Sequence, residues 1–332
     1  MSNSRCVTVV ICAYSLTRWN ATKAAVASVV GQRPAPAQVL LVIDYNPELA
    51  ALARAELPHV TVLENAGERG LSGARNTGLK AATESITAFL DDDAEAKPGW
   101  LAALVEPYDN AGVAATGGGV FPRWGRQRPD WLPPEFDWVV GCSYVGLPET
   151  TATIRNPIGA NMSFRTQLAL EAGGFSGSVG RVGTRPTGCE ETELAIRVTA
   201  LGNGSVIYVP AAAVDHYVGP ERTRFGYFVS RCWHEGQSKA AVVSLVGASS
   251  GLSRERRQTA AVIPAGMRRD LGSLVRGRVF GGARVAASAT GLAAAMSGYA
   301  AGRLARRGRE SVKPTDEGLS VEPAASRPSP LA

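Results

Sequence analysis

Short apolar runs and helical patterns alternate along the first ninety residues of the chain. Continuous runs of β-branched and other apolar residues, typical of strands covered on both faces, occupy 6–14, 38–44, 59–65 and 86–91. Helical patterns lie between them, at 20–31, 47–57 and 71–84. Asn46 and Pro47 suit the N-cap and first turn of the second helix. This alternation predicts an α/β fold with a doubly wound, mostly parallel sheet and helices on both faces.

Acidic residues follow two of these predicted strands. Asp44 ends the second strand, and the adjacent carboxylates Asp91, Asp92 and Asp93 end the fourth. Ligands of doubly wound sheets bind beyond the carboxyl ends of the strands. Three neighbouring carboxylates repel one another, whereas Mg²⁺ or Mn²⁺ binds well to such oxygen atoms. The pattern therefore predicts a metal site at this edge, the alternative being a solvated loop that contains three Asp.

The second half of the chain has a less regular pattern. Residues 121–148 are rich in Pro and Trp, which predicts a packed loop or short-strand excursion. A helix is expected around 165–172, and another over 189–202. The run 205–210 predicts a last strand, with His216 following it.

The C-terminal region is basic. Residues 251–310 contain twelve Arg, no Lys and three acids, a charge of +9, which leaves about −3 for the rest of a chain with net charge +6. Within this region, 285–302 has no charge but consists mainly of Ala, Gly and Ser, which insert poorly into bilayers. A surface-bound or helix-packed element is favoured over a membrane span, and basic residues beside it suit anionic lipid. The sequence shows neither a DNA-recognition helix pattern nor alternating aromatic and basic residues, so nucleic-acid binding is not expected.

The cysteines give an expectation about location. They are odd in number, widely spaced and without metal-ligand spacing: Cys6, Cys12, Cys142, Cys189 and Cys232. This pattern is typical of reduced thiols. The first apolar run has the pattern of a strand rather than of a signal peptide. We therefore expect a cytoplasmic protein, at the cytoplasmic face of the membrane if the basic region binds lipid.

Six ordered segments resemble the inverting glycosyltransferases of family 2, whose fold is called GT-A. They span about residues 6–218: VVICAYSLTRWN, SVVGQRPAPAQVLLVID, GLSGARNTGLKAA, FLDDDAEAKPGWL, GANMSFR and EETELAIR. The resemblance implies a metal-dependent transferase that moves a sugar from a nucleotide diphosphate, by family habit UDP, to an acceptor hydroxyl. The acceptor would be a glycan, a lipid-linked sugar or a small metabolite, as in cell-envelope polysaccharide biosynthesis. The matching segments place a catalytic domain over 1–240. The composition predicts a basic, Ala-rich helical extension over 241–310, which could associate with a membrane, and a disordered tail rich in Pro, Ser and Glu over 311–332.

The resemblance assigns roles to the acid cluster. Asp93 corresponds to the last acid of an Asp-x-Asp motif and would coordinate Mg²⁺ or Mn²⁺ on the donor diphosphate. Asp91 would bind the metal through water or contact the donor, and Asp92 would lie near the ribose. His216 matches a histidine that touches the metal or diphosphate in similar enzymes, the alternative being a structural histidine.

Three further residues would bind the donor. Arg75 would lie near the phosphates, unless it forms a surface salt bridge on its helix. Tyr14 would stack on the nucleotide base, unless it belongs to the core. Asp44 matches a base-reading acid, although Tyr45 stands where the family often has a second Asp or Asn.

A second acidic pair would serve the acceptor. Glu191 matches the catalytic base, in a Glu-Glu pair where the family has Glu-Asp, and Glu190 would orient the acceptor. The alternative is a pair of acids favoured by the dipole at a helix start. Arg181 and Arg185 could bind a uronic acid or an acceptor phosphate, as in glucuronosyltransferases that act on lipid-linked sugars, or belong to a solvated loop.

Other functions are less favoured. A nucleotidyltransferase would normally have a glycine-rich loop after the first strand, which CAYSLTRWN lacks. A non-catalytic, membrane-associated sugar-binding protein would be favoured by the loss of Asp93 or Glu191, and both are present. A nicotinamide dehydrogenase would need a G-x-G-x-x-G motif after that strand, which is also absent.

Overall fold

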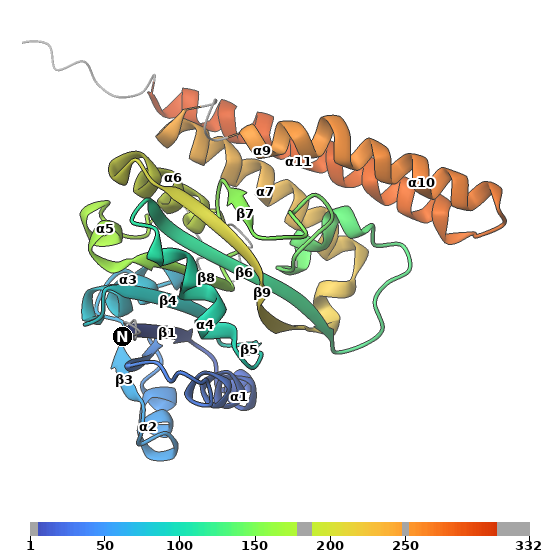
Figure 1. Ribbon diagram of the computed structural model, residues 1–332. Helices are drawn as coiled ribbons and strands as arrows, with labels where there is room; N and C mark the ends of the chain where they lie inside the picture. Colours follow the sequence, from blue (N-terminus) through green and yellow to red (C-terminus); the bar gives the residue numbers. More distant parts are fainter. Residues whose placement is uncertain (1–5, 178–187, 248–251, 311–332) are drawn as a thin grey trace, which may run out of the picture.

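A single mixed sheet organises the computed structural model, which describes residues 6–177, 188–247 and 252–310 (Figure 1). Its strands run in the order β3-β2-β1-β4-β8-β6-β9-β5, and β7 pairs with β9. The first four are mutually parallel: β1 (Val7–Ala13), β2 (Gln38–Ile43), β3 (Thr61–Glu64) and β4 (Ile86–Asp91). The others are β5 (Ala94–Ala96), β6 (Val113–Trp124), β7 (Ala152–Ile154), β8 (Asn161–Arg165) and β9 (Ser205–Val218).

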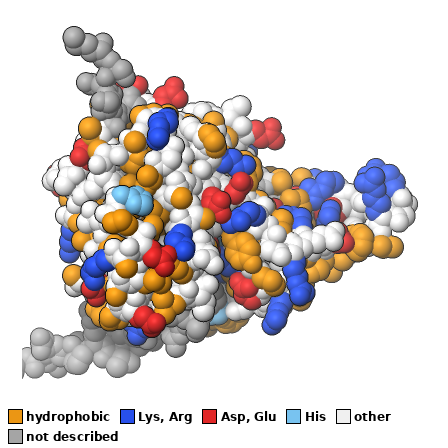
Figure 2. Space-filling view, turned by 90° about the horizontal axis from the view of Figure 1, so that it is seen from below, with side chains coloured by type: hydrophobic (Ala, Val, Ile, Leu, Met, Phe, Trp, Pro, Cys, Tyr) orange, Lys and Arg blue, Asp and Glu red, His pale blue; other side chains and the backbone are white. Residues whose placement is uncertain are grey.

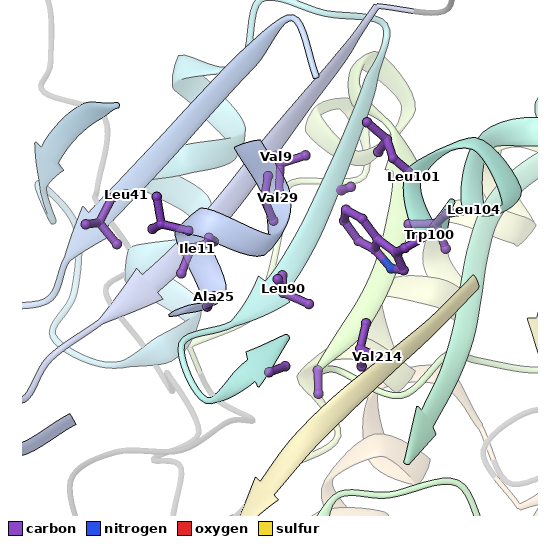
Figure 3. Close-up of a cluster of buried hydrophobic side chains, with 14 of the residues drawn as sticks. Val9, Ile11, Ala25, Val29, Leu41, Leu90, Trp100, Leu101, Leu104 and Val214 are labelled. Atoms are coloured by element: carbon purple, nitrogen blue, oxygen red, sulfur yellow. The ribbon is translucent and has the colours of Figure 1, made fainter. Parts of the chain in front are cut away.

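Helices cover both faces of the sheet and bury two separate apolar clusters against it. One face carries α1 (Trp19–Val30), α2 (Pro47–Glu56) and α4 (Trp100–Val105), and the other carries α3 (Leu71–Ala81), α5 (Thr166–Glu171) and α6 (Glu190–Gly202). Figure 3 shows the first cluster, which includes Ile11 of β1, Val29 of α1 and Trp100 of α4. The predicted α/β class with a mostly parallel sheet is confirmed, as is the N-cap, where Asn46 Oδ1 accepts from Leu49 N at 3.1 Å.

Strand β9 is longer than the sequence pattern predicts, and β6 begins in a stretch for which the sequence predicts no strand. They pair in parallel from Val113 opposite Ser205 to Trp124 opposite Val218. Each strand supplies backbone hydrogen-bond partners to the other. The pairing therefore continues through residues whose own sequence does not have a strand pattern. The predicted loop over 121–148 therefore begins with four strand residues, and the expected strand end at 210 is wrong. His216 lies inside β9 rather than after it.

A group of C-terminal helices, three of them long, follows the sheet and lies along one side of it (Figure 1). They are α7 (Phe225–Val246), α9 (Ser253–Arg257), the π-helical turn η5 (Gln258–Val262), α10 (Ile263–Val275) and α11 (Phe280–Glu310). Short 3₁₀ turns occur at η1 (Leu16–Arg18), η2 (Glu106–Asp109), η3 (Pro134–Val140) and η4 (Pro220–Thr223). A third apolar cluster joins η3 to these helices through Phe136, Phe228 and Ile263.

Glycines let α7 and α11 pack backbone against backbone. A Cβ on Gly236 would collide with the carbonyl oxygen of Ala295, and a Cβ on Gly298 would collide with that of Trp233. The uncharged run over 285–302 is therefore the part of α11 that packs on α7. None of the helices in the described ranges combines the length and the apolar character needed to cross a lipid bilayer.

Candidate functional site

A cavity of about 1260 Å³ opens at the carboxyl ends of β1, β2 and β4. These strands are parallel, so the residues that follow them meet at one edge of the sheet. Tyr14 follows β1, Asp44 follows β2, and 91–93 ends β4; all of them line the cavity. The opposite wall comes from the start of α6, from β9 and from the C-terminal helices. The cavity therefore joins residues from both ends of the chain.

Asp91, Asp93 and His216 form a candidate metal cluster at this edge. Each offers one ligand atom, and these atoms lie within 4.8 Å of one another. His216 Nε2 is 3.3 Å from Asp93 Oδ1. The antiparallel pairing of β5 with β9, which sets Ala94 opposite His216, holds the histidine beside the acids. Two carboxylates and an imidazole fit Mn²⁺ or Mg²⁺ and leave coordination positions for water and phosphate oxygens.

Two arginines that the sequence interpretation missed contact the same acids. Arg18 Nη2 lies 3.1 Å from Asp92 Oδ1 and also contacts Asp93, and Arg222 Nη2 lies 3.4 Å from Asp93 Oδ2. Burial opposes ionisation of Asp93, yet His216 and both arginines hold its pKa below the ordinary value. Burial raises the pKa of Asp92 to about 8. Proximity in sequence was the available signal, since Arg18 follows Tyr14 closely and Arg222 follows His216.

Arg75 connects the metal cluster to the second acidic pair. Its side chain donates from Nη1 to Glu190 Oε1 at 2.9 Å, and from Nη2 to Asp91 Oδ1 at 3.1 Å and the Gly159 carbonyl at 2.9 Å. Arg75 is only 2% exposed, so the surface salt bridge considered for it is wrong. A buried guanidinium with three acceptors fixes the relative positions of β4, α6 and the turn before β8.

The two remaining candidates for donor binding, Tyr14 and Asp44, follow the adjacent strands β1 and β2. Tyr14 is 54% exposed and lines the cavity, so the core alternative for it is wrong. Asp44 accepts hydrogen bonds from Gly70 N at 3.0 Å and from Asn65 Nδ2 at 2.7 Å. Asp44 thus orders the loop before α3, while Tyr14 lines the cavity with the guanidinium of Arg18 over its ring, 5.7 Å from the ring centroid.

Glu191 lies in the cavity wall at the first turn of α6. Burial raises its pKa to about 7, the charge of Glu190 adds to the effect, and Lys239 opposes it. Thr192 Oγ1 donates to Glu191 Oε1 at 3.1 Å. Glu190 Oε2 is buried and has no hydrogen-bond partner among the residues that the structure describes. A buried carboxyl group with a pKa near 7 can accept a proton at physiological pH, as a general base must.

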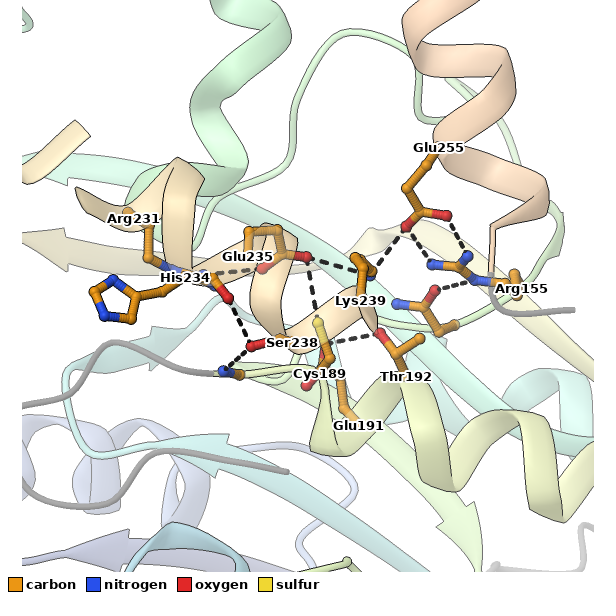
Figure 4. Close-up of polar contacts among 12 residues, drawn as sticks. Arg155, Cys189, Glu191, Thr192, Arg231, His234, Glu235, Ser238, Lys239 and Glu255 are labelled. Carbon is orange, nitrogen blue, oxygen red and sulfur yellow. Dashed lines mark hydrogen bonds and ion pairs between the residues drawn. The ribbon is translucent and has the colours of Figure 1, made fainter. Parts of the chain in front are cut away.

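An ion network lies beside Glu191 and ties the C-terminal helices to the sheet. It consists of Arg155, Arg231, Glu235, Lys239 and Glu255 (Figure 4). Lys239 Nζ is 2.9 Å from Glu255 Oε1 of α9 and 3.2 Å from Glu235 Oε1 of α7, and Arg155 Nη2 donates to Glu255 Oε1 at 2.8 Å. The sequence interpretation missed this network, although the four-residue spacing of the three α7 members is a helical ion-pair signal.

The two arginines predicted to bind a uronic acid or a phosphate, Arg181 and Arg185, lie outside the described residues. The described wall of the acceptor side is therefore formed by the start of α6, the ion network and the C-terminal helices.

Comparisons with known proteins identify relatives of the chain. A family model described as Glycosyl transferase family 2 matches residues 8–172. The glucosyl-dolichyl phosphate glucuronosyltransferase of Haloferax volcanii is 35% identical over 237 residues, which cover 70% of this chain and 76% of that protein. The succinoglycan biosynthesis protein ExoM of Rhizobium meliloti is 26% identical over 245 residues, covering 68% and 75%.

Two solved structures share the fold. The mannosyltransferase PcManGT from Pyrobaculum calidifontis, in complex with GDP-Man and Mn²⁺, has a TM-score of 0.59 at 18% identity, covering 89% of this chain and 88% of that one. GalNAc-T7 with UDP, GalNAc and Mn²⁺ has a TM-score of 0.52 at 18% identity. The match covers 77% of this chain and 54% of the GalNAc-T7 chain, so this chain spans about half the length of GalNAc-T7.

Proposed function

The chain belongs to glycosyl transferase family 2 and is a glycosyltransferase, and from that premise we propose that it transfers a sugar from a nucleotide diphosphate to an acceptor hydroxyl with inversion. One observation carries the proposal: a single cavity contains both the cluster of Asp91, Asp93 and His216 and the half-buried Glu191. Arg75 joins the two through Glu190. Donor and acceptor would thus meet between a metal cluster and a base.

The donor would bind at the carboxyl ends of β1, β2 and β4. The exposed ring of Tyr14 is suited to stacking on the nucleotide base. Arg18 and Arg222, which neutralise Asp93 in this structure, would stay close enough to contact the diphosphate. When bound at Asp91, Asp93 and His216, Mg²⁺ or Mn²⁺ supplies positive charge that stabilises the leaving diphosphate. Both structural neighbours contain Mn²⁺, which supports this role for the cluster.

Glu191 would act as the general base. Its carboxylate removes the proton of the acceptor hydroxyl while the oxygen attacks the anomeric carbon. Attack from the face opposite the diphosphate forms the new glycosidic bond, releases the nucleoside diphosphate and inverts the carbon. Glu190, held by Arg75, would orient the acceptor beside the base.

The acceptor would be a sugar linked to a lipid. The Haloferax volcanii relative is named for transfer of glucuronic acid to glucosyl-dolichyl phosphate, and its similarity covers 70% of this chain. We therefore favour a hexosyl or glucuronosyl donor linked to UDP. The second relative is named for succinoglycan biosynthesis, which supports a role in making cell-envelope polysaccharide.

The tip of the α10–α11 hairpin would rest on a membrane. Five large apolar side chains are exposed there: Leu271, Leu274, Val275, Val279 and Phe280. The exposed Arg276 and Arg278 flank them, and Figure 2 shows basic and apolar side chains together on the projecting helices. Exposed apolar side chains beside arginine are suited to the surface of an anionic bilayer. We place this contact on the cytoplasmic face, in keeping with the five cysteines, none of which forms a disulfide within the described residues.

The division into a catalytic domain over 1–240 and an extension over 241–310 also stays a proposal. Helix α7 continues through the boundary, and Lys239, just before it, binds Glu255 of α9. The extension would thus act together with the catalytic domain rather than as a separate appendage.

A nucleotide-sugar screen tests the proposed function. Purified full-length protein is incubated with UDP-, GDP- and dTDP-sugars, with Mg²⁺, Mn²⁺ or excess chelator, and release of nucleoside diphosphate is measured. We expect metal-dependent release from one donor class, accelerated by a lipid-linked sugar. Release of pyrophosphate from a sugar phosphate and a nucleoside triphosphate would instead support a nucleotidyltransferase and refute the proposal.

A further inference from the structure

The cavity does not end at Glu191. It continues between the catalytic sheet and the C-terminal helices, where its lining becomes apolar. We call this part the apolar arm and define it by six lining residues: Trp138, Leu252, Ile263, Leu292, Ala295 and Met296. Five of them lie in the C-terminal helices or next to them: Leu252 just before α9, Ile263 in α10, and Leu292, Ala295 and Met296 in α11. The polar residues Gln258, Thr259 and Tyr299 also line the cavity. A mainly apolar wall nevertheless suits a sugar poorly, because buried hydroxyl groups need hydrogen-bond partners.

The size of the cavity indicates more than one ligand. Its volume of about 1260 Å³ exceeds the roughly 300–1,000 Å³ of most small-molecule sites. The part of the cavity at the strand ends would hold the donor, and the part near Glu191 would hold an acceptor sugar. The apolar arm is additional space, continuous with both.

The ion network stands between Glu191 and the apolar arm. It contains three cationic and two anionic side chains, so it carries one surplus positive charge. Lys239 is buried, and the charge of Lys239 also acts on Glu191. Figure 4 shows Lys239 between Glu191 of α6 and Glu255 of α9. An anion at this place would be attracted by Lys239 and Arg155 and would lie at the entrance of the apolar arm.

The order of these chemical environments matches one class of molecule. We propose that the apolar arm binds the hydrocarbon chain of a lipid phosphate, with the phosphate beside Lys239 and Arg155 and the attached sugar at Glu191. This inference rests on the proposed function and deepens it by assigning the lipid to α9, α10 and α11. Met296, which is 64% exposed, marks the mouth where a longer chain leaves the protein.

Binding of alkyl phosphates to the full-length protein tests this inference. Calorimetry compares dodecyl phosphate, butyl phosphate and inorganic phosphate, all below micellar concentration. Each methylene that enters an apolar site improves affinity about fourfold. We therefore expect dodecyl phosphate to bind at least about tenfold more tightly than butyl phosphate, which itself binds more tightly than inorganic phosphate.

Variants of α11 test where the hydrocarbon chain of the bound alkyl phosphate lies. Met296→Asp places a charge at the mouth, and Leu292→Asp places one deeper in the apolar arm. Both should remove most of the preference for dodecyl over butyl phosphate while leaving nucleotide binding unchanged. Leu304→Asp is the matched control, because Leu304 is exposed on the same helix and does not line the cavity. Met296 is on the surface, so its variant tests the inference even if Leu292→Asp fails to fold.

Nucleotide binding, measured in the same samples with UDP or GDP and Mn²⁺, separates the two proposals. If a nucleotide binds but dodecyl phosphate binds no better than butyl or inorganic phosphate, the apolar arm is not a lipid site and the proposed function stands. Unchanged chain preference in both α11 variants would overturn the inference as well. If dodecyl phosphate binds as expected and no nucleotide does, the lipid site is supported and the proposed function fails.

Discussion

Arg75 Nη1 lies 2.9 Å from Glu190 Oε1, and this buried ion pair joins the two acidic motifs of the molecule. The second nitrogen of the same guanidinium lies 3.1 Å from Asp91 Oδ1. A carboxylate of the metal cluster and the first residue of α6 are therefore bound to one side chain. Any shift of α6 relative to β4 would break one of these contacts, so the guanidinium keeps the proposed base at a fixed distance from the metal cluster.

Arg75→Gln should destabilise the protein by about 3–5 kcal/mol, because it leaves two carboxylates near each other without a cation. Arg75→Lys should recover part of the stability but not the geometry, because one ammonium cannot replace a guanidinium that reaches three acceptors. Urea unfolding measures the change in the free energy of unfolding. Arg54→Gln is the control, since Arg54 pairs with Glu64 at the surface and should contribute less than about 1 kcal/mol. Equal effects of the Arg75 and Arg54 variants would contradict the structural role of Arg75.

Glu191→Gln should lower kcat by at least about a hundredfold, since positioned general bases contribute on the order of 10²–10⁴-fold. Donor affinity should change little, because Glu191 lies on the acceptor side of the cavity. Steady-state kinetics and calorimetry with the donor separate the two effects. Glu171→Gln, an exposed acid at the end of α5, serves as the control. Near-normal turnover of Glu191→Gln would show that the acceptor is already an anion or that another group is the base.

The pKa of Glu191 predicts opposite pH dependences for activity and stability. Activity needs the carboxylate, so kcat/KM should fall about tenfold per pH unit below about 7. Between the ordinary value of 4.5 and about 7, the unfolded chain releases a proton that the folded protein retains. This group therefore lowers stability as pH rises through that window, and Glu191→Gln should escape the loss. Urea midpoints at pH 5 and pH 8 measure the difference, and a constant gap between wild type and variant would refute the assignment.

Asp93→Ala should abolish Mn²⁺ binding and reduce turnover to background. Asp93 offers a ligand atom next to those of Asp91 and His216, so its loss leaves a single carboxylate and an imidazole to hold the ion. Calorimetry of Mn²⁺ with UDP present measures the binding. Glu95→Gln changes a nearby acid on β5 that pairs with Arg123, and it should bind metal normally. Full turnover of the wild-type protein in excess chelator would show that the reaction needs no metal.

The double variant Val275→Asp, Val279→Asp should reduce binding to anionic membranes by at least about tenfold. Val275 is 87% exposed, so the substitutions remove apolar contact with lipid and add negative charge without disturbing the core. Co-sedimentation with vesicles of phosphatidylglycerol and phosphatidylcholine measures the binding, which should also weaken with added salt. Leu201→Asp is the control, because Leu201 is an exposed apolar residue of α6, and this variant should bind like the wild type. Binding of the double variant at wild-type strength would exclude the hairpin tip as the contact.

The first half of the fold could be predicted because its signals are local. An apolar run such as 86–91 is buried wherever its sheet lies, and β4 has these bounds. The extent of β6 depends instead on contacts that are distant in sequence. Gly118 lies against Ala212 and Asn161, and its strand pairs with β8 and β9. A run of three glycines has no strand pattern of its own, so the strand exists because of its neighbours.

The site divides in the same way. The acid cluster could be predicted because three adjacent carboxylates repel one another, and such a group at the end of a strand indicates a bound cation. Arg18 and Arg222 were harder to predict, because their proximity in sequence to Tyr14 and His216 is a weak signal that arginines at the surface share. The pairing of Lys239 with Glu255 depends on how α9 folds back over α7, which periodicity alone does not indicate.

The wall formed by α9, α10 and α11 has a consequence for synthesis of the protein on the ribosome. A chain interrupted after β9 already contains every proposed catalytic residue, from Asp91 to His216. It lacks the helices that close the cavity, so the apolar residues of η3 would face water and attract chaperones or proteases. The last helices to be translated thus complete the enzyme, and incomplete chains would be degraded rather than accumulate as partly active transferases.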